Sequence, residues 1–215
     1  MAFPTTGVLD NFTGTDGTAL PTYSANWGGS FFGDTNLQIL TNTANCPSAS
    51  CGNYWQATQF GPDSEAYGTI ALTTPDDGFR LFVRCGGTSL NTALNAYQVR
   101  VGNVNQTTLQ ISRTDAGTTT VLGANIAITA LGVGDMLGIS VVGNTITAYI
   151  NYASGGGWAS VGSRTDSTYS AAGYIALEEW HTTANYGLDN FGGGTVVAIP
   201  LLNIDPIMQS AVYRM

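Results

Sequence analysis

Short runs in which apolar and polar residues alternate make up most of this chain, and they constrain its fold more than any other feature. Apolar residues recur at every second position in the runs 78–85, 96–101 and 107–113. This is the pattern of strands with one buried face. Runs 135–142 and 145–151 flank Gly143-Asn144, a pair typical of a tight hairpin turn. No stretch of about ten residues follows the helical period of 3.6. The sequence therefore predicts an all-β domain of antiparallel strands.

A repeated triplet indicates how that domain closes. Asp10-Asn11-Phe12 near the start recurs as Asp189-Asn190-Phe191 near the end. Two matching segments at opposite ends suggest first and last strands that lie side by side in a two-sheet sandwich. We therefore expect a short lead-in at 1–7, one β-domain at 8–194 and a C-terminal arm at 195–215.

The composition excludes several classes of partner. Charged residues are 9% of the 215 residues, the net charge is −8, and all six basic residues are arginines. Phosphate binding needs concentrated positive charge, so we expect no nucleic-acid partner and no docking on anionic membranes. No apolar run approaches the ~20 residues of a membrane span. The hydrophobic content of 43% is enough for one full core.

The first residues carry no recognisable export signal. Met-Ala-Phe-Pro-Thr-Thr-Gly has neither the basic nor the apolar region of a secretory signal peptide. The polar residues are mainly Thr, Ser, Asn, Gln and Gly, in the style of extracellular and particle-exposed β-proteins. Two interpretations follow: the chain is processed, or the protein leaves the cell without a signal, as a virus particle released by lysis does.

Three cysteines leave their pairing open. Cys46 and Cys51 are close enough in sequence to close a small disulfide loop, although sequence alone does not determine pairing. Zinc is not favoured, because the chain has one histidine and no second cysteine pair. Cys85 lies in an apolar run and is expected to be a small buried hydrophobe.

The order of several motifs resembles a known fold family. The motifs are Gly-Asp-x-Leu-Gly-Ile-x-Val-x-Gly-Asn-x-Ile-x-Ala-Tyr-Ile-Asn (134–151), Trp-x-x-Val (158–161), Asp-Ser-Thr-Tyr (166–169), Gly-Tyr-Ile-Ala-Leu (173–177) and Leu-Asp-Asn-Phe (188–191). Together they resemble concanavalin A-like lectin/glucanase domains, with the laminin G-like branch nearest in style. The opening Leu-Asp-Asn-Phe-Thr-Gly-x-Asp-Gly-x-x-Leu (9–20), followed by Asn26-Trp27, also looks like modules of tailed-phage tail and virion proteins.

The resemblance covers roughly residues 8–194, and its motifs are structural rather than catalytic. It implies a jelly-roll β-sandwich with an extended C-terminal arm beyond it. It further implies two antiparallel sheets, one of them concave, with ligands often held on the concave face or on the rim loops.

Glu178-Glu179 is the one carboxylate pair of catalytic type. Retaining glycosidases need two carboxyl groups about 5 Å apart on one face. Adjacent strand residues point to opposite faces, so these two cannot act together. Glucanases of the family that this chain resembles carry a Glu-x-Asp-x-x-Glu strand, and that spacing does not occur here. We therefore expect one exposed and one structurally paired glutamate, and no enzyme activity.

Asp10 and Asp189 are the candidate metal ligands. If the end strands pair, these carboxylates come together, and hard oxygen ligands are what calcium prefers. Domains of the family that the chain resembles often hold calcium, so a structural calcium ion is one hypothesis. The alternative is that these Asp and Asn side chains bond nearby backbone amides at the strand ends.

Aromatic residues are the candidates for ligand contact. Sugar rings stack on exposed tryptophan and tyrosine faces, whereas most aromatic residues of a sandwich belong to its core. The candidates for exposure are Tyr54 and Trp55, just after the cysteine loop, and Trp180 with His181. We therefore predict glycan contacts at these four residues.

The tail is apolar although it follows the strand that should complete the sandwich. Its apolar residues are Val197, Ile199, Leu201, Leu202, Ile204, Ile207 and Met208. Such residues must cover something: either their own domain, or a neighbouring subunit to which they add a strand or whose groove they fill. Pro200 and Pro206 favour an extended arm over a helix.

These observations predict a non-enzymatic structural or decorating protein of a tailed-phage virion, displayed on the capsid or tail. We expect the arm to anchor it to other virion proteins or to copies of itself, and its outer face to bind surface glycans as well. Two alternatives are a carbohydrate-binding adhesin module and an atypical glycoside hydrolase. The hydrolase would require two converging carboxylates.

Overall fold

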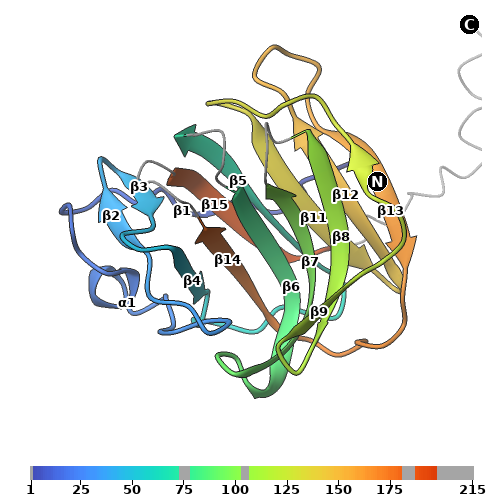
Figure 1. Ribbon diagram of the computed structural model, residues 1–215, viewed down its shortest axis with the longest axis horizontal. Helices are drawn as coiled ribbons and strands as arrows, with labels where there is room; N and C mark the ends of the chain where they lie inside the picture. The colour runs from blue at the N-terminus through green and yellow to red at the C-terminus, as the bar shows by residue number, and fades with distance from the viewer. Residues whose placement is uncertain (1, 73–77, 103–106, 181–186, 198–215) are drawn as a thin grey trace, which may run out of the picture.

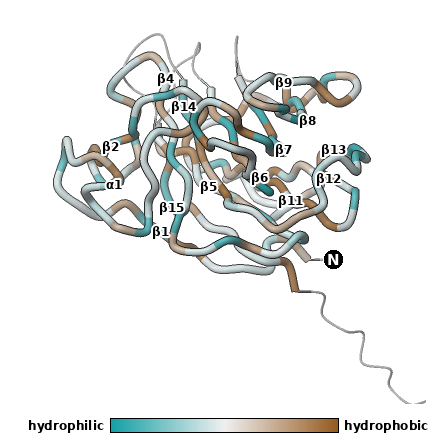
Figure 2. Tube along the Cα trace, turned by 90° about the horizontal axis from the view of Figure 1, so that it is seen from below, coloured by the Kyte–Doolittle hydropathy of each residue, from teal (hydrophilic) through white to brown (hydrophobic). Residues whose placement is uncertain are grey.

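Two antiparallel β-sheets pack face to face in the computed structural model, which describes residues 2–72, 78–102, 107–180 and 187–197. The eight-stranded sheet contains β13 (Ala159–Thr165), β12 (Thr145–Asn151), β11 (Met136–Val142), β5 (Ser64–Leu72), β15 (Gly187–Thr195), β3 (Thr43–Asn45) and β2 (Gln38–Leu40) in that order, with β1 (Val8–Asp10) also paired to β15. The seven-stranded sheet contains β10 (Ile126–Ala127), β8 (Thr108–Asp115), β7 (Ala93–Gly102), β6 (Gly78–Ser89), β14 (Tyr174–Trp180) and β4 (Ser50–Tyr54), with β9 (Thr118–Val121) paired to β8. Figure 2 shows the two layers, with β14, β7 and β8 in one and β15, β5 and β11 in the other.

The alternating runs form strands as predicted, and alternation determines which side chains enter the core. On β6, Phe79, Leu81 and Val83 are fully buried between the sheets, while Arg80 and Phe82 point to the outer face. The Gly143-Asn144 turn joins β11 to β12, with Val142 opposite Thr145. The one helix in the described residues, α1 (Leu20–Tyr23), spans four residues. No helix of the described part is long and apolar enough to cross a membrane.

The repeated triplets lie side by side, as the sequence predicts. β1 pairs antiparallel with β15, and Asp10 is opposite Phe191 (Figure 1). The rings of Phe12 and Phe191 both pack on the indole of Trp27, with centroids 5.7 and 5.2 Å away. The Asp10 carboxylate accepts hydrogen bonds from the Trp27 Nε1–H at 2.8 Å and from the Phe12 N–H at 2.7 Å. One buried cluster thus joins the two ends of the domain.

The described part of the lead-in, residues 2–7, packs onto the eight-stranded sheet. Both the N–H and the hydroxyl of Thr5 and of Thr6 donate to Oε1 of Glu65, which is 1% exposed. The Phe3 ring stacks on Tyr149, 3.9 Å between centroids and 2° from parallel. The N-terminal segment is therefore part of the folded unit.

The sandwich continues slightly past the boundary expected at Gly194. Thr195 is the last residue of β15, and the Val196 N–H donates to the Asp63 carbonyl with Val196 7% exposed. Val197 follows and is 67% exposed, at the apolar end of the described chain in Figure 2. The remaining arm residues of the prediction, Ile199, Leu201, Leu202, Ile204, Ile207 and Met208, lie outside the described residues.

The cysteines behave in two different ways. Cys46 and Cys51 form a disulfide bond, with their Cα atoms 5.3 Å apart and both side chains buried. Cys85 is a free thiol in the cluster that contains Phe31 and Phe82. Burial raises its pKa well above the ordinary value, so this thiol behaves as a small hydrophobe.

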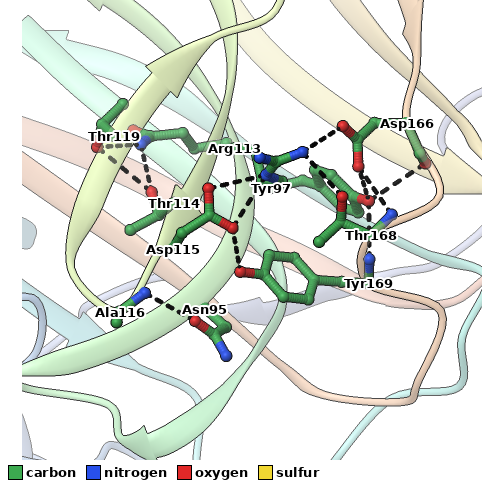
Figure 3. A network of polar contacts seen from close by, with 11 residues as sticks. Asn95, Tyr97, Arg113, Thr114, Asp115, Ala116, Thr119, Asp166, Thr168 and Tyr169 are labelled. Carbon is green, nitrogen blue, oxygen red and sulfur yellow. Dashed lines mark hydrogen bonds and ion pairs between the residues drawn. The ribbon is translucent and has the colours of Figure 1, made fainter.

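A polar network fastens the segment between β13 and β14 to the edge of the seven-stranded sheet (Figure 3). Asp166 accepts hydrogen bonds from the Tyr97 hydroxyl and from Arg113 Nη1, each at 2.7 Å. Arg113 also pairs with Asp115, which accepts from the Tyr169 hydroxyl. Burial alone would raise the pKa of Asp166, but the hydrogen bonds from Tyr97, Thr168 and Arg113 outweigh it and lower that pKa to about 2.

We expect Asp10→Ala to reduce the free energy of unfolding by about 2 kcal/mol, because a buried indole N–H loses its acceptor. Asp189→Ala is the matched control from the other triplet, since among the described residues the Asp189 carboxylate bonds only to its neighbour Asn190. It should cost about 1 kcal/mol or less. Urea unfolding of the two variants checks this, and equal losses would refute the asymmetry.

The lowered pKa of Asp166 predicts a pH dependence of stability. Because the folded pKa lies below the unfolded value of 3.8, the contribution is present above pH 4 and is lost as the pH falls towards 2. Asp166→Asn should lower the free energy of unfolding at pH 7 by at most about 2 kcal/mol and flatten its fall between pH 4 and 2. Urea unfolding at several pH values measures both. An unchanged slope in the variant would contradict the assignment.

Candidate functional site

The chain's own N-terminal segment packs on part of the outer face of the eight-stranded sheet. The Phe3 ring lies over Gly138, where an added Cβ would come within 2.4 Å of Phe3 Cζ. The same ring stacks on Tyr149 and makes an edge contact with Trp158, whose ring centroid lies 4.9 Å from that of Phe3. The aromatic residues of this face are therefore engaged within the chain.

Among the described residues, loops cover one part of the opposite outer face, that of the seven-stranded sheet. Phe31 and Phe32 fold onto Phe82 and Tyr54, forming a second apolar cluster with Tyr174 and others outside the main core. The cluster ends at Phe32, whose ring lies 5.4 Å from the guanidinium carbon of Arg80. Beyond this point the face is polar.

Trp180 dominates the polar half. Its indole extends from β14 across β6 to β7, and it fits because Gly78 and Gly102 face it. A Cβ at either glycine would lie 2.2 Å from Trp180 Cζ2. The guanidinium carbons of Arg80 and Arg100 each lie 4.6 Å from the ring centroid, within the range of cation–π attraction. The two arginines pair across β6 and β7, two residues along from the paired glycines, so both approach the indole from the same direction.

A pocket of about 250 Å³ opens beside this aromatic group. It is lined by Arg100, Gly102, Thr108, Gln110 and Asn125. Gln110 lies opposite Arg100 on β8, and its Nε2 donates to Asn125 Oδ1 at 3.0 Å. Guanidinium, carboxamide and hydroxyl groups offer both donors and acceptors to a polar ligand. No carboxylate is among these lining residues.

The glutamate pair lies on two faces, as the alternation predicts, but neither residue is exposed. Glu178 is 2% exposed on the outer side, and its oxygens accept from Arg80 Nη1 at 2.5 and 2.6 Å. Glu179 is fully buried between the sheets and accepts from the Leu188 N–H. The expectation of one exposed glutamate is therefore wrong, because Arg80 and the loop residues cover Glu178.

A second carboxylate lies near Glu178 on the outer side. Asp34 accepts from the Ser50 hydroxyl at 2.6 Å and comes from the loop that ends the apolar cluster. Burial raises the pKa of Asp34. Burial also raises the pKa of Glu178 to about 7, with Arg80 acting in the opposite direction and Asp34 adding to the rise. Asp34 was not among the residues that the sequence pattern identified.

The four residues predicted to contact glycans differ in where the structure places them. Trp180 is half-buried on the polar face, as described. Tyr54 is half-buried in the second apolar cluster, 5.3 Å from Tyr174 between ring centroids. The predicted glycan contact at Trp55 is wrong, because this side chain is 6% exposed and packs edge-on against Trp27 in the main core. It cannot offer a ring face to a ligand. His181 lies outside the described residues.

Asp10 and Asp189 come together, and both carboxylates accept hydrogen bonds from other groups of the chain. Asp10 accepts from Phe12, Trp27 and Tyr23, and Asp189 accepts from the N–H and the side chain of Asn190. Burial raises the pKa of Asp189, and the charge of Asp10 adds to the rise. No group of three or more His, Cys, Asp or Glu side chains in the described residues could hold a metal ion. The bonds from the Phe12 and Asn190 N–H groups are the backbone bonds of the alternative interpretation, whereas the Trp27 and Tyr23 side chains bond Asp10 from farther along the chain.

Several residues of this face escaped the sequence analysis. Arg80 and Arg100 sit at alternate positions of runs predicted as strands, and Gln110 sits in a third. Alternation would have placed Arg80 with Trp180 and Arg100 with Gln110 on one side if the strand order had been known. Asn125, from the loop before β10, has no periodic pattern that could have identified it.

Comparison with known proteins places the fold. No family model matches the chain, and no curated protein matches it either. Among solved structures, the carbohydrate-binding module CBM66 from Bacillus subtilis aligns with a TM-score of 0.55 at 15% identity, over 87% of this chain and 99% of that one. The Bacillus licheniformis beta-glucanase aligns at 0.56 and 13% identity, over 90% and 100%. The Emp46p carbohydrate recognition domain, in a potassium-bound form, aligns at 0.60 and 8% identity, over 89% and 97%. The chain therefore has the concanavalin A-like jelly-roll fold of lectins and glucanases.

Proposed function

We propose that this protein is a non-enzymatic glycan-binding module that uses the polar half of the seven-stranded sheet's outer face. The observation that carries the proposal is the Trp180 indole, held over Gly78 and Gly102 beside a pocket of about 250 Å³. A sugar combines hydroxyl groups with apolar C–H faces. Polar side chains next to an aromatic ring satisfy both, and convergent groups in a concave site are typical of ligand binding.

The burial of the carboxylates supports a binding role over a catalytic one. Hydrolysis of a glycosidic bond requires two carboxyl groups that reach the sugar. Both oxygens of Glu178 are bonded to Arg80, and Glu179 faces the core. Asp34 is the feature that would favour the hydrolase alternative, because it lies near Glu178 with a raised pKa.

The ligand class agrees with two of the three structural relatives. One is named as a carbohydrate-binding module and one as a carbohydrate recognition domain, whereas the third is a glucanase. Because identities are 8–15%, these names support the proposal only through the shared fold.

We expect Trp180→Ala to weaken glycan binding by about 30-fold or more, as loss of an aromatic anchor does in other interfaces. Trp158→Ala, on the opposite sheet beneath Phe3, is the matched control and should leave binding unchanged. A glycan array identifies the ligand, and titration calorimetry measures its affinity. The bound glycan should also stay intact when its reducing ends are assayed over time. Cleavage that is lost in Glu178→Gln would establish the hydrolase instead.

As a second proposal, the protein is a component of a virion and its C-terminal arm serves assembly. The support for it within the described residues is Val197, an apolar side chain 67% exposed just after β15. The arm would anchor the module to other virion proteins or to further copies of itself, while the glycan-binding face points outward.

A chain shortened after Val197 tests the arm, because a cut at Gly194 would remove the end of β15 and the bond of Val196 to Asp63. We expect the full chain to form oligomers and the shortened chain to be a monomer of unchanged melting temperature. Light scattering measures both masses. Oligomers of equal size in the two proteins would assign assembly to the sandwich itself.

A further inference from the structure

The arginines of this chain are almost completely paired. All cations are arginines, and five of the six lie in the described residues. Four of these five arginines contact oxygen atoms. Arg80 pairs with the carboxylate of Glu178, and Arg113 pairs with those of Asp115 and Asp166. The other two bond mainly backbone carbonyls: Arg84 those of Pro62, Gly143 and Tyr169, in addition to the Asp63 carboxylate, and Arg164 those of Leu122, Ala124 and Ser163. Arg100 is the exception within this part of the chain, since its guanidinium makes no hydrogen bond or ion pair with an oxygen atom of the described residues.

The Arg100 guanidinium lies between the Trp180 ring and the pocket. It is held 4.6 Å from the Trp180 ring centroid and lines the pocket together with Gln110. Burial lowers the pKa of Arg100, and the positive charge of Arg80 lowers it further, while Glu178 acts in the opposite direction. Glu178, whose charge acts on the pKa of Arg100, is already bonded to Arg80 through both oxygens. A partly buried cation is thus left with its donors unused beside an open pocket.

Resting on the proposed glycan-binding function, we propose that the Arg100 pocket selects acidic sugars, whose carboxylate or sulfate group accepts hydrogen bonds from this guanidinium. A guanidinium offers a planar fork of N–H donors that matches such groups. Gln110, Asn125 and Thr108 are placed to bond the hydroxyls of the same sugar. The overall charge of −8 repels anions, so any preference for acidic glycans must come from the pocket rather than from the protein's general field.

The test compares acidic sugars with matched neutral ones on the full chain. The probes are trigalacturonate with its methyl ester, and sialyl-lactose and sulfated lactose with lactose, supplemented by matched pairs on a glycan array. We expect about 10- to 100-fold tighter binding of an acidic member than of its neutral partner, the effect of one charge-assisted hydrogen-bond pair. The uronate, sialate and sulfate probes show which acidic group is selected.

Two variants assign the preference to Arg100. Arg100→Gln should abolish the preference, so that the acidic and neutral members of each pair bind with equal affinity. Gln110→Glu, opposite Arg100 in register, should have the same effect on the preference by supplying an internal partner to the cation. Arg164→Gln removes the same charge from the other sheet and should leave the preference intact. Melting temperatures establish that each variant is folded.

The outcomes separate this inference from the function on which it rests. Neutral binding that equals or exceeds acidic binding, and that depends on Trp180, overturns the acidic preference but leaves the glycan-binding function standing. A preference that survives both Arg100→Gln and Gln110→Glu overturns the role of Arg100. If no sugar on the array or among the probes binds, both proposals fail.

Discussion

The fold depends on the cluster in which the two ends of the domain meet over Trp27. The indole N–H donates to Asp10 in the first strand, and the ring is packed by one phenylalanine from each triplet, Phe12 and Phe191. Trp55 closes the cluster edge-on from β4. The pairing of the first and last strands brings these side chains together. A buried charge that accepts three hydrogen bonds is stable there, whereas an unsatisfied one would not be.

The two outer faces of the closed sandwich differ in which segments of the chain pack on them. The N-terminal segment is anchored by four hydrogen bonds to one oxygen of Glu65, and its Phe3 covers the aromatic side chains of the eight-stranded sheet. Within the part of the chain that the structure describes, loops cover the seven-stranded sheet over its apolar cluster. The polar half of its outer face carries Trp180 and the pocket.

The chemistry of the open face follows from how scarce cations are distributed. A chain with six arginines and no lysine uses nearly all that the structure describes to satisfy carboxylates or backbone carbonyls. Glu178 is neutralised by Arg80 and is held away from the pocket, which separates the buried carboxylates from the surface that would meet a sugar. Arg100, stacked on the same indole, retains its donors. This division of roles favours recognition over hydrolysis.

The sequence by itself determined the strands, the hairpin at Gly143-Asn144 and the meeting of the two triplets, because these follow from local periodicity, turn chemistry and a repeated motif. It also placed Glu178 and Glu179 on opposite faces. Only the tertiary structure decided that Trp55 is buried while Trp180 lies against the pocket residue Arg100, and that Asp10 bonds an indole. The physical reason is that alternation assigns a side chain to a face, whereas exposure and partners depend on which distant loop or strand covers that face.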